Sequence, residues 1–589
     1  MTQIEIDGQP VSLSPGRDYD YIARNPIFTK EGEHTYDVDI DLSVPENARL
    51  YHHINRHDCN NVPTGRTARL MCDNRCIITG SEIVLSMDND MAKIQLVGGN
   101  SEMNFNGKKK IRELDFGKFN VTLEKARASL SSSYPSYGYV CCPVLCNTEQ
   151  NFWGVSSAYY NLVDTVANPS TPVTAPAATL RPQPYLIYYV EKLMKLMGYS
   201  IKENVMKDGK TDRLICVNGM DTNLYADLLP DWTVDEFITQ IERLFNLIFV
   251  IGGNGKEVSI VRSTDYYAKR EPVVIPADDV LRDIRKEFQR DEEVYLNYTN
   301  VKYEFPDIEY YQFADLEPEV IDLCEKRENP MLDLYIPPDT FNKFILYRDQ
   351  KFGQYHIHRT VSNEGGTHNF KQHIMFLQRK VNDPLDEDFV ELEIVPAEIY
   401  LRKDGEVYNF CVPFSRNVIE VNGPQNPDNK IKEPGLVDVI QNGIQKKQAP
   451  NRLFIAYYDG YQEFFLGFNP NTGEAVRSGQ QLRIPMCHTI PFEHGIYSAG
   501  DTGIYCVWPD KRVTLAIDGE YGLYNTLYKT NQKVNTSQRI TISFLRHGRM
   551  FNPLDTYIIA HKKYFCEELK YKFNEQGLSD VVEGTFLLM

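Results

Sequence analysis

The residues best suited to chemistry in this 589-residue chain include a cluster of histidines. His52, His53 and His57 lie within six residues, and Asp58 follows the last of them. The i, i+4 spacing of His53 and His57 would place two metal ligands on one face of a helix. Metalloprotease helices carry a glutamate directly after the first histidine, and this chain does not. We therefore interpret the cluster as surface or capping histidines.

Cysteines are the second group that could bind a metal. Cys72 and Cys76 have C-x3-C spacing, and Cys141, Cys142 and Cys146 form a separate cluster. Zinc sites use paired C-x2-C units or histidines at ligand spacing, and neither cluster has them. We expect reduced cysteines that pack as small apolar residues, and no metal ligands.

An enzyme that degrades cell-wall or capsular polysaccharide is the main catalytic alternative. Such an enzyme needs two carboxylates about 5 to 10 Å apart in a cleft lined with aromatic residues. Acidic residues and tyrosines are abundant in 291–325 and 456–465, but abundance does not place them in a cleft. Cys487 and His488 are adjacent, with His494 nearby, yet a nucleophile and its base must meet in space. The sequence has no Gly-x-Ser-x-Gly, His-Glu-x-x-His or phosphate-loop motif, so we expect no catalytic and no cofactor-binding residues.

Tyrosine is unusually frequent, with 37 residues against 3 tryptophans. Aromatic residues suit half-buried strands, and tyrosine is also enriched at protein interfaces. One aromatic run could form a binding platform for a host surface glycan, although core packing of a strand pair explains the same residues. Its members are Tyr457, Tyr458, Tyr461, Phe464 and Phe465.

The charge and composition exclude several classes of protein. A formal net charge of −18 argues against specific nucleic-acid binding, which needs clustered Lys and Arg. Lys108, Lys109 and Lys110 are the exception, and we expect them at a solvated hairpin tip. The start of the chain lacks the pattern of a secretory signal, and no run has the roughly 20 apolar residues of a membrane-spanning helix. We expect synthesis and folding in a cytoplasm.

The elements that would position any site are clearest between residues 231 and 263. Apolar residues recur there at three- and four-residue steps, which predicts an amphipathic helix. Thr233 and Glu236 have capping-box spacing at its start. Residues 247–251 and 257–262 flank a Gly-Gly-Asn-Gly sequence and predict a β-hairpin. The stretch 185–197 predicts a second amphipathic helix.

The remaining segments are mostly β in pattern. Residues 35–42 alternate strictly and predict one half-exposed strand with Tyr36 on its inner face. We predict a β-rich α+β, multidomain chain with a small inserted α+β domain. Its parts are an N-terminal β domain (1–133), a proline-rich connection (134–184), the small α+β domain (185–270), a second β domain (271–385), a β-rich insertion (386–523) and a C-terminal β segment (524–589).

Three groups of residues resemble landmarks of a tail protein family in phages and prophages of the Bacteroidetes. They are an opening motif (25–32) with a following 44–48 segment, the run Ala68-Arg69-Leu70 with Gly80 a few residues on, and the closing strands (557–584). The predicted helix and hairpin also resemble a module of tail-hub proteins, which are related in fold to the base of the type VI secretion spike.

The resemblance implies a structural virion component rather than an enzyme. It implies a baseplate hub, a homotrimer built on tail-tube-like β-barrel or sandwich domains, which joins the tail tube to the tail tip or spike. Its expected partners are further copies of itself and other tail proteins, including the tube, the tape measure and the tip or spike. The expected location is the virion tail, after assembly in the cytoplasm of a bacterial host.

Overall fold

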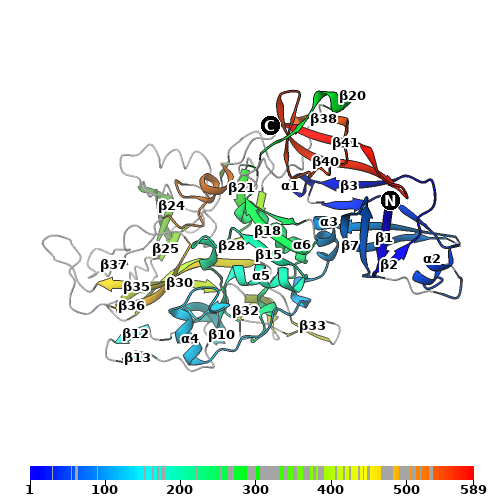
Figure 1. Ribbon diagram of the computed structural model, residues 1–589. Helices are drawn as coiled ribbons and strands as arrows, with labels where there is room; N and C mark the ends of the chain where they lie inside the picture. The colour runs from blue at the N-terminus through cyan, green and yellow to red at the C-terminus, as the bar shows by residue number, and fades with distance from the viewer. Residues whose placement is uncertain are drawn as a thin grey trace.

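The protein is β-rich, with several sheets and short helices between them (Figure 1), which confirms the predicted β-rich α+β, multidomain class. The computed structural model describes residues 1–29, 31–54, 56–59, 64–88, 90–151, 154–161, 163, 165–168, 171–173, 180–220, 222–252, 255–262, 267, 271–287, 300–305, 331–335, 342–348, 355–361, 372–375, 380–381, 390–404, 408–415, 418–423, 426–434, 438–441, 444–447, 452–465, 482–489, 505–506, 512–517, 519–529 and 535–589. The α-helices in these ranges are α1 (Pro26–Thr29), α2 (Pro45–Leu50), α3 (Gly99–Asn106), α4 (Leu123–Leu130), α5 (Leu186–Leu196) and α6 (Val234–Phe245).

The largest sheet is built from both ends of the chain, and we call it the terminal sheet. Its main path runs β2-β1-β6-β7-β8-β4-β3-β40-β41-β38-β20, with β5, β19 and β39 attached at its sides. In Figure 1 the blue N-terminal strands and the red C-terminal strands lie side by side. The bounds are β1 (Thr2–Ile6), β2 (Gln9–Val11), β3 (Tyr19–Arg24), β4 (Glu33–Thr35), β5 (Val38–Asp41), β6 (Thr67–Cys72), β7 (Arg75–Met87), β8 (Met91–Gly98), β19 (Val273–Ile275), β20 (Val280–Glu287), β38 (Asn535–Leu545), β39 (Thr556–Ile559), β40 (Lys562–Asn574) and β41 (Gly577–Leu588).

Two further sheets surround the helices. One has the order β15-β18-β17, with strands at Ser200–Asn204, Glu257–Arg262 and Leu247–Ile251. The other joins β16 (Leu214–Cys216), β35 (Leu453–Phe465), β28 (Ile394–Pro396), β36 (Leu482–His488) and β37 (Tyr505–Cys506). Segments far apart in the sequence therefore meet in one layer, with β35 at its centre.

The smaller sheets complete the described strands. Their members are β9 (Tyr139–Val140) with β14 (Gln183–Pro184); β10 (Val144–Asn151), β11 (Gly154–Tyr160), β29 (Glu398–Asp404) and β30 (Tyr408–Ser415); β12 (Thr165–Asn168) with β13 (Thr171–Val173); β21 (Asn300–Tyr303), β26 (Lys380–Val381) and β27 (Val390–Leu392); β22 (Met331–Tyr335), β23 (Asn342–Arg348), β24 (Tyr355–Val361) and β25 (Gln372–Met375); β31 (Val418–Gly423) with β32 (Asn426–Pro434); and β33 (Asp438–Gln441) with β34 (Ile444–Lys447).

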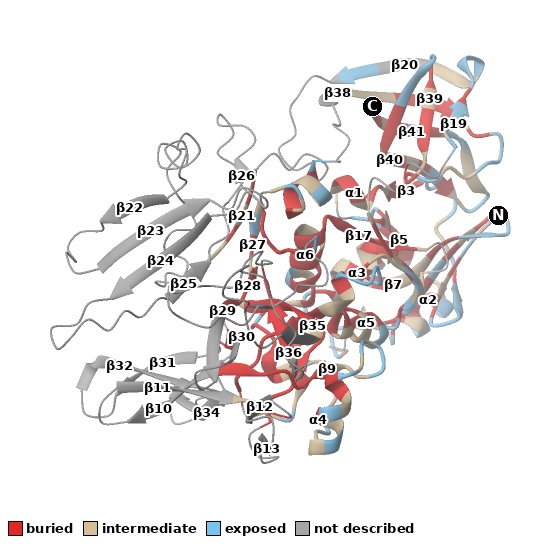
Figure 2. Cartoon of the chain, turned by 90° about the vertical axis from the view of Figure 1, so that its left-hand side faces the viewer, coloured by how far each residue is buried: buried red, intermediate tan, exposed pale blue. Residues whose placement is uncertain are grey.

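Helix α6 and its hairpin confirm the prediction from the sequence. The Thr233 side chain accepts from the Glu236 backbone, and the Glu236 carboxylate accepts from the Thr233 backbone, so both halves of the capping box are present. The helix ends at Asn246, whose left-handed conformation (φ 51°) starts the turn into β17. The apolar face of α6 is buried in the larger core, drawn red in Figure 2. Strands β17 and β18 pair antiparallel, as expected for a hairpin.

Asn100 connects the terminal sheet to this hairpin. It lies in α3, directly after β8, and its amide reaches the backbone of β17. Its Nδ2 donates to the carbonyl of Phe249 (2.5 Å), and its Oδ1 accepts from the N–H of Ile251 (3.1 Å). The side chain thus pairs with β17 much as a neighbouring strand would.

Asn25 holds the second connection between these parts. Its side chain is fully buried, and its Nδ2 lies 2.8 to 2.9 Å from the Tyr267 hydroxyl and the carbonyls of Pro553 and Cys566. Its Oδ1 accepts from the N–H of Ile27 at 3.1 Å. A small apolar cluster surrounds it and contains residues of α1, β17, β18, β40 and β41.

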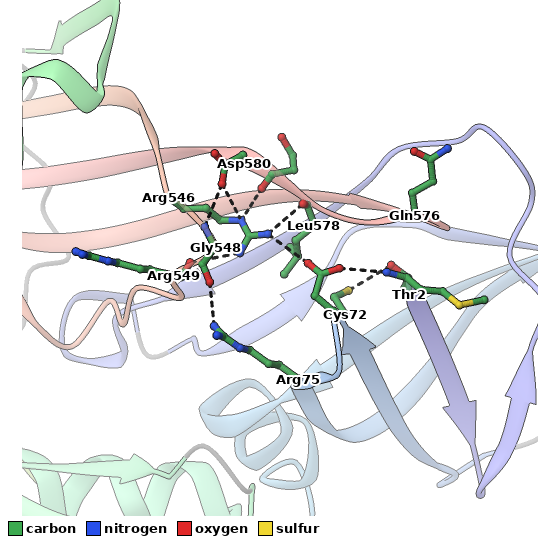
Figure 3. Close-up of polar contacts among 12 residues, drawn as sticks. Thr2, Cys72, Arg75, Arg546, Gly548, Arg549, Gln576, Leu578 and Asp580 are labelled. Atoms are coloured by element: carbon green, nitrogen blue, oxygen red, sulfur yellow. Dashed lines mark hydrogen bonds and ion pairs between the residues drawn. The ribbon is translucent and has the colours of Figure 1, made fainter.

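A group of ionic and backbone hydrogen-bond contacts joins the first strand, β1, to the hairpin of β40 and β41 (Figure 3). The backbone N–H of Thr2 donates to the carbonyl of Glu575 at 3.0 Å. Arg546 is 6% exposed, and its guanidinium donates to the carbonyls of Ser579 and Leu578 at 2.7 and 3.1 Å. It also contacts Asp73 at 3.3 Å, and Asp73 in turn binds the N-terminal amine. These contacts fix the first strand against the last hairpin.

Two local predictions were wrong. Residues 35–42 do not form one strand, because the chain breaks between β4 and β5 and leaves Tyr36 46% exposed, with Thr35 fully buried instead. Lys108 to Lys110 do not form a hairpin tip, because helix α3 precedes them and Lys110 makes an isolated bridge to Thr233. The conformation of each segment depends on the segment with which it pairs. The local sequence pattern does not specify that partner.

We predict that Asn25→Ala lowers the free energy of unfolding by about 3 kcal/mol, because several buried groups lose their hydrogen-bond partner at once. Chemical denaturation of the full chain measures this loss. Asn106→Ala, a half-buried asparagine at the end of α3, is the matched control and should change stability by less than about 0.5 kcal/mol. Equal stabilities of the two variants would contradict the role assigned to Asn25.

Candidate functional site

The predicted aromatic platform lies on strand β35, and the structure divides its members. Tyr457 and Tyr458 are each 5% exposed and belong to the larger core. Tyr461 is half-buried. The side chains of Phe464 and Phe465 lie outside the described residues. Tyr457 and Tyr458 are consecutive residues of a strand, so their side chains point to opposite sides of its sheet.

A β-bulge interrupts β35 in the middle of this run. The register with β36 shifts between Tyr458 and Tyr461, and Gly460 takes a left-handed conformation (φ 69°). A glycine tolerates this conformation because it has no Cβ. The bulge changes the direction of the strand and places Asp459 and Tyr461 at an open pocket.

Asp459 is the centre of a buried ionic cluster. Its side chain is 2% exposed and contacts Arg213 through one oxygen and His488 through the other. Arg213 also donates to the carbonyl of Tyr458 at 3.2 Å. The Arg213 side chain is 27% exposed, so the cluster lies between the core and the solvent.

Two hydrogen bonds hold the ring of His488. Its Nδ1 bonds Asp459, and its Nε2 lies 2.9 Å from the carbonyl oxygen of Val513. The Tyr457 ring stacks on it at 5.4 Å between centroids. Both ring nitrogens therefore have partners inside the protein, and the ring is fixed in the core.

The side chain of the adjacent Cys487 is directed at a different partner. It is 1% exposed, and its Sγ lies 3.4 Å from Sγ of Cys142 rather than at the His488 ring. Adjacent residues of a strand point to opposite faces, which separates the two side chains. His494 lies outside the described residues.

The pocket has a volume of about 790 Å³, within the range of small-molecule sites. Its walls combine four tyrosines, three consecutive serines and the Asp212–Arg213–Asp459 group; the tyrosines are Tyr134, Tyr185, Tyr458 and Tyr461. Burial raises the pKa of Asp212, and the nearby Asp208 raises it further. Aromatic rings beside hydroxyl and carboxyl groups are the chemistry of a site for a neutral polar ligand, such as a saccharide.

Several residues of the site were not predicted from the sequence. Arg213, Tyr134 and Tyr185 come from segments more than 200 residues before β35, and β16 brings Arg213 to it by pairing with β35. The only local signal was the Asp-Gly dipeptide at 459–460, which is typical of a turn or a bulge.

The described histidines and cysteines of the two candidate metal clusters form no group of three ligands. His52 and His53 lie in the turn after α2 with positive φ angles (53° and 54°), and Cys72 is fully buried in the terminal sheet. No group of three or more metal-ligating side chains occurs among the residues that the structure describes. The acidic stretch 306–325 falls outside these ranges.

Fold and site together define a multi-sheet α+β protein with an open pocket, lined by tyrosines, at a bulged central strand. Within the described part of the chain, no helix is both long enough and apolar enough to cross a membrane. No known family model matches the chain, and no curated protein matches it.

Solved structures of two tail proteins are similar to the chain at a low level. One is the 43 kDa tail protein of prophage MuSo2 from Shewanella oneidensis, with 7% identity, a TM-score of 0.29, and coverage of 99% of this chain and 95% of that one. The other is the tail protein from Neisseria meningitidis MC58, with 8% identity, a TM-score of 0.31, and coverage of 100% and 96%. Similarity at this level does not establish a shared fold or function.

We predict strong coupling between Arg213 and Asp459. Arg213→Met and Asp459→Asn should each destabilise the chain by about 3 kcal/mol, because each leaves a buried charged partner without its ion pair. The double variant should cost less than the sum by about 1 to 3 kcal/mol in denaturation experiments. Arg17→Met, at an exposed pair with Asp39, is the control and should cost less than about 1 kcal/mol. Strict additivity would show that the two residues act independently.

Proposed function

We propose that the chain is a structural component of a phage or prophage tail, and that it forms the homotrimeric hub between the tail tube and the tail tip or spike. The observation that carries the proposal is the position of the residues that resemble the tail protein family. All three groups lie in or against the terminal sheet, where the two ends of the chain meet.

The opening motif supports this proposal through its packing. Ile27 and Phe28 of α1 are 1% and 4% exposed, and the Phe28 ring packs edge-on against Phe565 at 5.9 Å. Arg24 donates to Glu568 at 2.7 Å, across the β3–β40 pair. These residues hold two ends of a chain together, which is an architectural role.

The second landmark group has the same role. Leu70 is fully buried and lies opposite Ile4 in the β1–β6 pair. Gly80 lies opposite Ala68 in the β6–β7 pair, where a Cβ atom would come within 2.0 Å of the Val97 carbonyl oxygen. Residues resembling the family thus serve strand pairing and close packing, with no part in the pocket.

The proposed assembly uses the terminal sheet as the tube-like ring and places the small α+β domain (185–270) as an insertion beside it. Val274 and Val581, on strands of this sheet, are 56% and 40% exposed, and such apolar side chains gain stability when a subunit covers them. Its neighbours would be the tube, the tape measure and the tip or spike. A ring with an acidic inner wall would let DNA pass, because like charges repel phosphates, and the net charge of −18 fits this function.

We expect a solution mass of about three times the 68.0 kDa of one chain, measured by light scattering. Gold-labelled antibodies against the chain should mark one end of intact phage tails in electron micrographs. Val581→Lys should lower the trimer fraction by placing charges at the ring interface. Leu196→Lys, on α5 with a matched exposure of 37% against 40%, should leave it unchanged. A monomer absent from purified virions would overturn the proposal.

The pocket favours a second candidate function, recognition of a host surface glycan by the same hub. Two of the five platform residues predicted from the sequence, Tyr458 and Tyr461, line it. Tyr134 and Tyr185 add further aromatic surface, and the serine hydroxyls and Asp212 add hydrogen-bonding groups. In this alternative the glycan contacts the pocket, while Tyr457 and the His488 ring support it from the core.

A glycan array tests this candidate with the full chain. We expect binding to neutral glycans and a loss of about tenfold or more in the Tyr461→Ala variant, because a ring that contacts the sugar is removed. Tyr36→Ala removes a tyrosine that is 46% exposed on the terminal sheet and should leave binding unchanged. Failure of the unaltered chain to bind any glycan would exclude this function.

A further inference from the structure

Cys142 and Cys487 are two buried thiols in contact, although 344 residues separate them in the sequence. Their Sγ atoms lie 3.4 Å apart, and the residues are 0% and 1% exposed. A disulfide requires an Sγ–Sγ distance of about 2.05 Å. A small rotation of the two side chains would bring the sulfur atoms from contact to this distance. Neither the pocket nor the terminal sheet requires this arrangement.

The backbone on both sides of the contact is firmly held. The carbonyl of Cys142 accepts from Nδ2 of Asn161 at 2.8 Å, and Asn161 is itself fully buried. Cys487 lies opposite Tyr458 in the β35–β36 pair. Because these elements fix the two residues, the thiols stay close together in the folded chain at a very high effective concentration.

The pocket lies next to the two thiols. Tyr458 lines the pocket and lies opposite Cys487 in the β35–β36 pair. Tyr458 is tethered at its hydroxyl, which donates to the carbonyl of Leu130 at 2.7 Å. Tyr458 therefore belongs both to the wall of the pocket and to the strand pair that holds Cys487.

We propose that Cys142 and Cys487 form a reversible disulfide when the protein leaves a reducing compartment. A thiolate of one cysteine attacks a small-molecule disulfide and releases one of its halves as a thiol. The second thiolate then displaces the other half and closes the protein bond. One protein S–S bond replaces the S–S bond of the oxidant, two protein thiols lose their protons, and two electrons pass to the small-molecule disulfide.

The timing of this step depends on the proposed function as a virion protein. In a host cytoplasm both cysteines stay reduced, because the thiol pool there is reducing. After release from the cell, the disulfide would tie residue 142 beside β9 to residue 487 on β36. That bond would restrict the unfolded chain over a very long loop and so stabilise the folded hub.

Incubation of the full chain with oxidised glutathione, followed by peptide mapping without reductant, tests the proposal. We expect a peptide pair linked through Cys142 and Cys487, two fewer titratable thiols, and a melting temperature higher by about 5 °C. Dithiothreitol should restore both values. Cys487→Ser and Cys142→Ser should each abolish the linked peptide and the thermal shift, whereas Cys76→Ser, at an exposed thiol, should keep both.

Persistent reduction of both thiols for days in oxidised glutathione, even in mild urea that loosens the pocket, would overturn the proposal. Linkage of either residue to a different cysteine would overturn it as well. The assay uses the isolated chain, so it does not depend on assembly into a tail. If the chain forms the disulfide but is absent from virions, the proposed hub function is refuted and the disulfide proposal stands.

Discussion

The rest of the structure depends on the pairing of β3 with β40 and on the asparagine that follows β3. This pair joins the first residues of the chain to the last, and the backbone N–H of Asn25 continues it by donating to Glu567. The Asn25 side chain then donates to the carbonyl of Cys566 in β40. Helix α1 packs Ile27 and Phe28 against the β17–β18 hairpin. A single buried amide thus connects the terminal sheet, the small α+β unit and the closing hairpin. Buried amides are stabilising only when all their groups are satisfied, which explains the dense set of partners around it.

The local sequence was sufficient to predict elements that contain both a clear hydrophobic periodicity and the signals that mark their ends. Helix α6 has its capping box, and the predicted helix at 185–197 corresponds to α5. Pairings between distant segments were beyond such reasoning, because strand partners depend on the whole fold. Tyr36 illustrates the limit: its alternation was correct for a strand, yet it lies in the break between β4, which pairs with both β3 and β8, and β5, which pairs with β8, and its side chain is exposed to the solvent.

The site shows the same division between local and distant information. The aromatic run on β35 was visible in the sequence, but the bulge at Gly460, which precedes the pocket residue Tyr461, was not. The two partners of Asp459 are Arg213, from a short 3₁₀ helix (Thr211–Arg213), and His488, from β36. They are far apart in the sequence, so no spacing rule could have predicted that they meet. Cys487 and His488 show the opposite case. They are adjacent in the sequence, but their side chains point to opposite sides of one strand.

The pairing of the two chain ends has a consequence for how the protein is made. Strand β3 ends at residue 24, whereas β40 ends at residue 574, so β3 lacks its partner until about 550 further residues have been made. At about 5 to 20 residues per second, this interval is roughly half a minute to two minutes. During that time β3 has an open edge of the kind that promotes mispairing between nascent chains. Only a chain that extends through β40 can close it, so products terminated before β40 cannot build the terminal sheet and are excluded from any assembly that requires it.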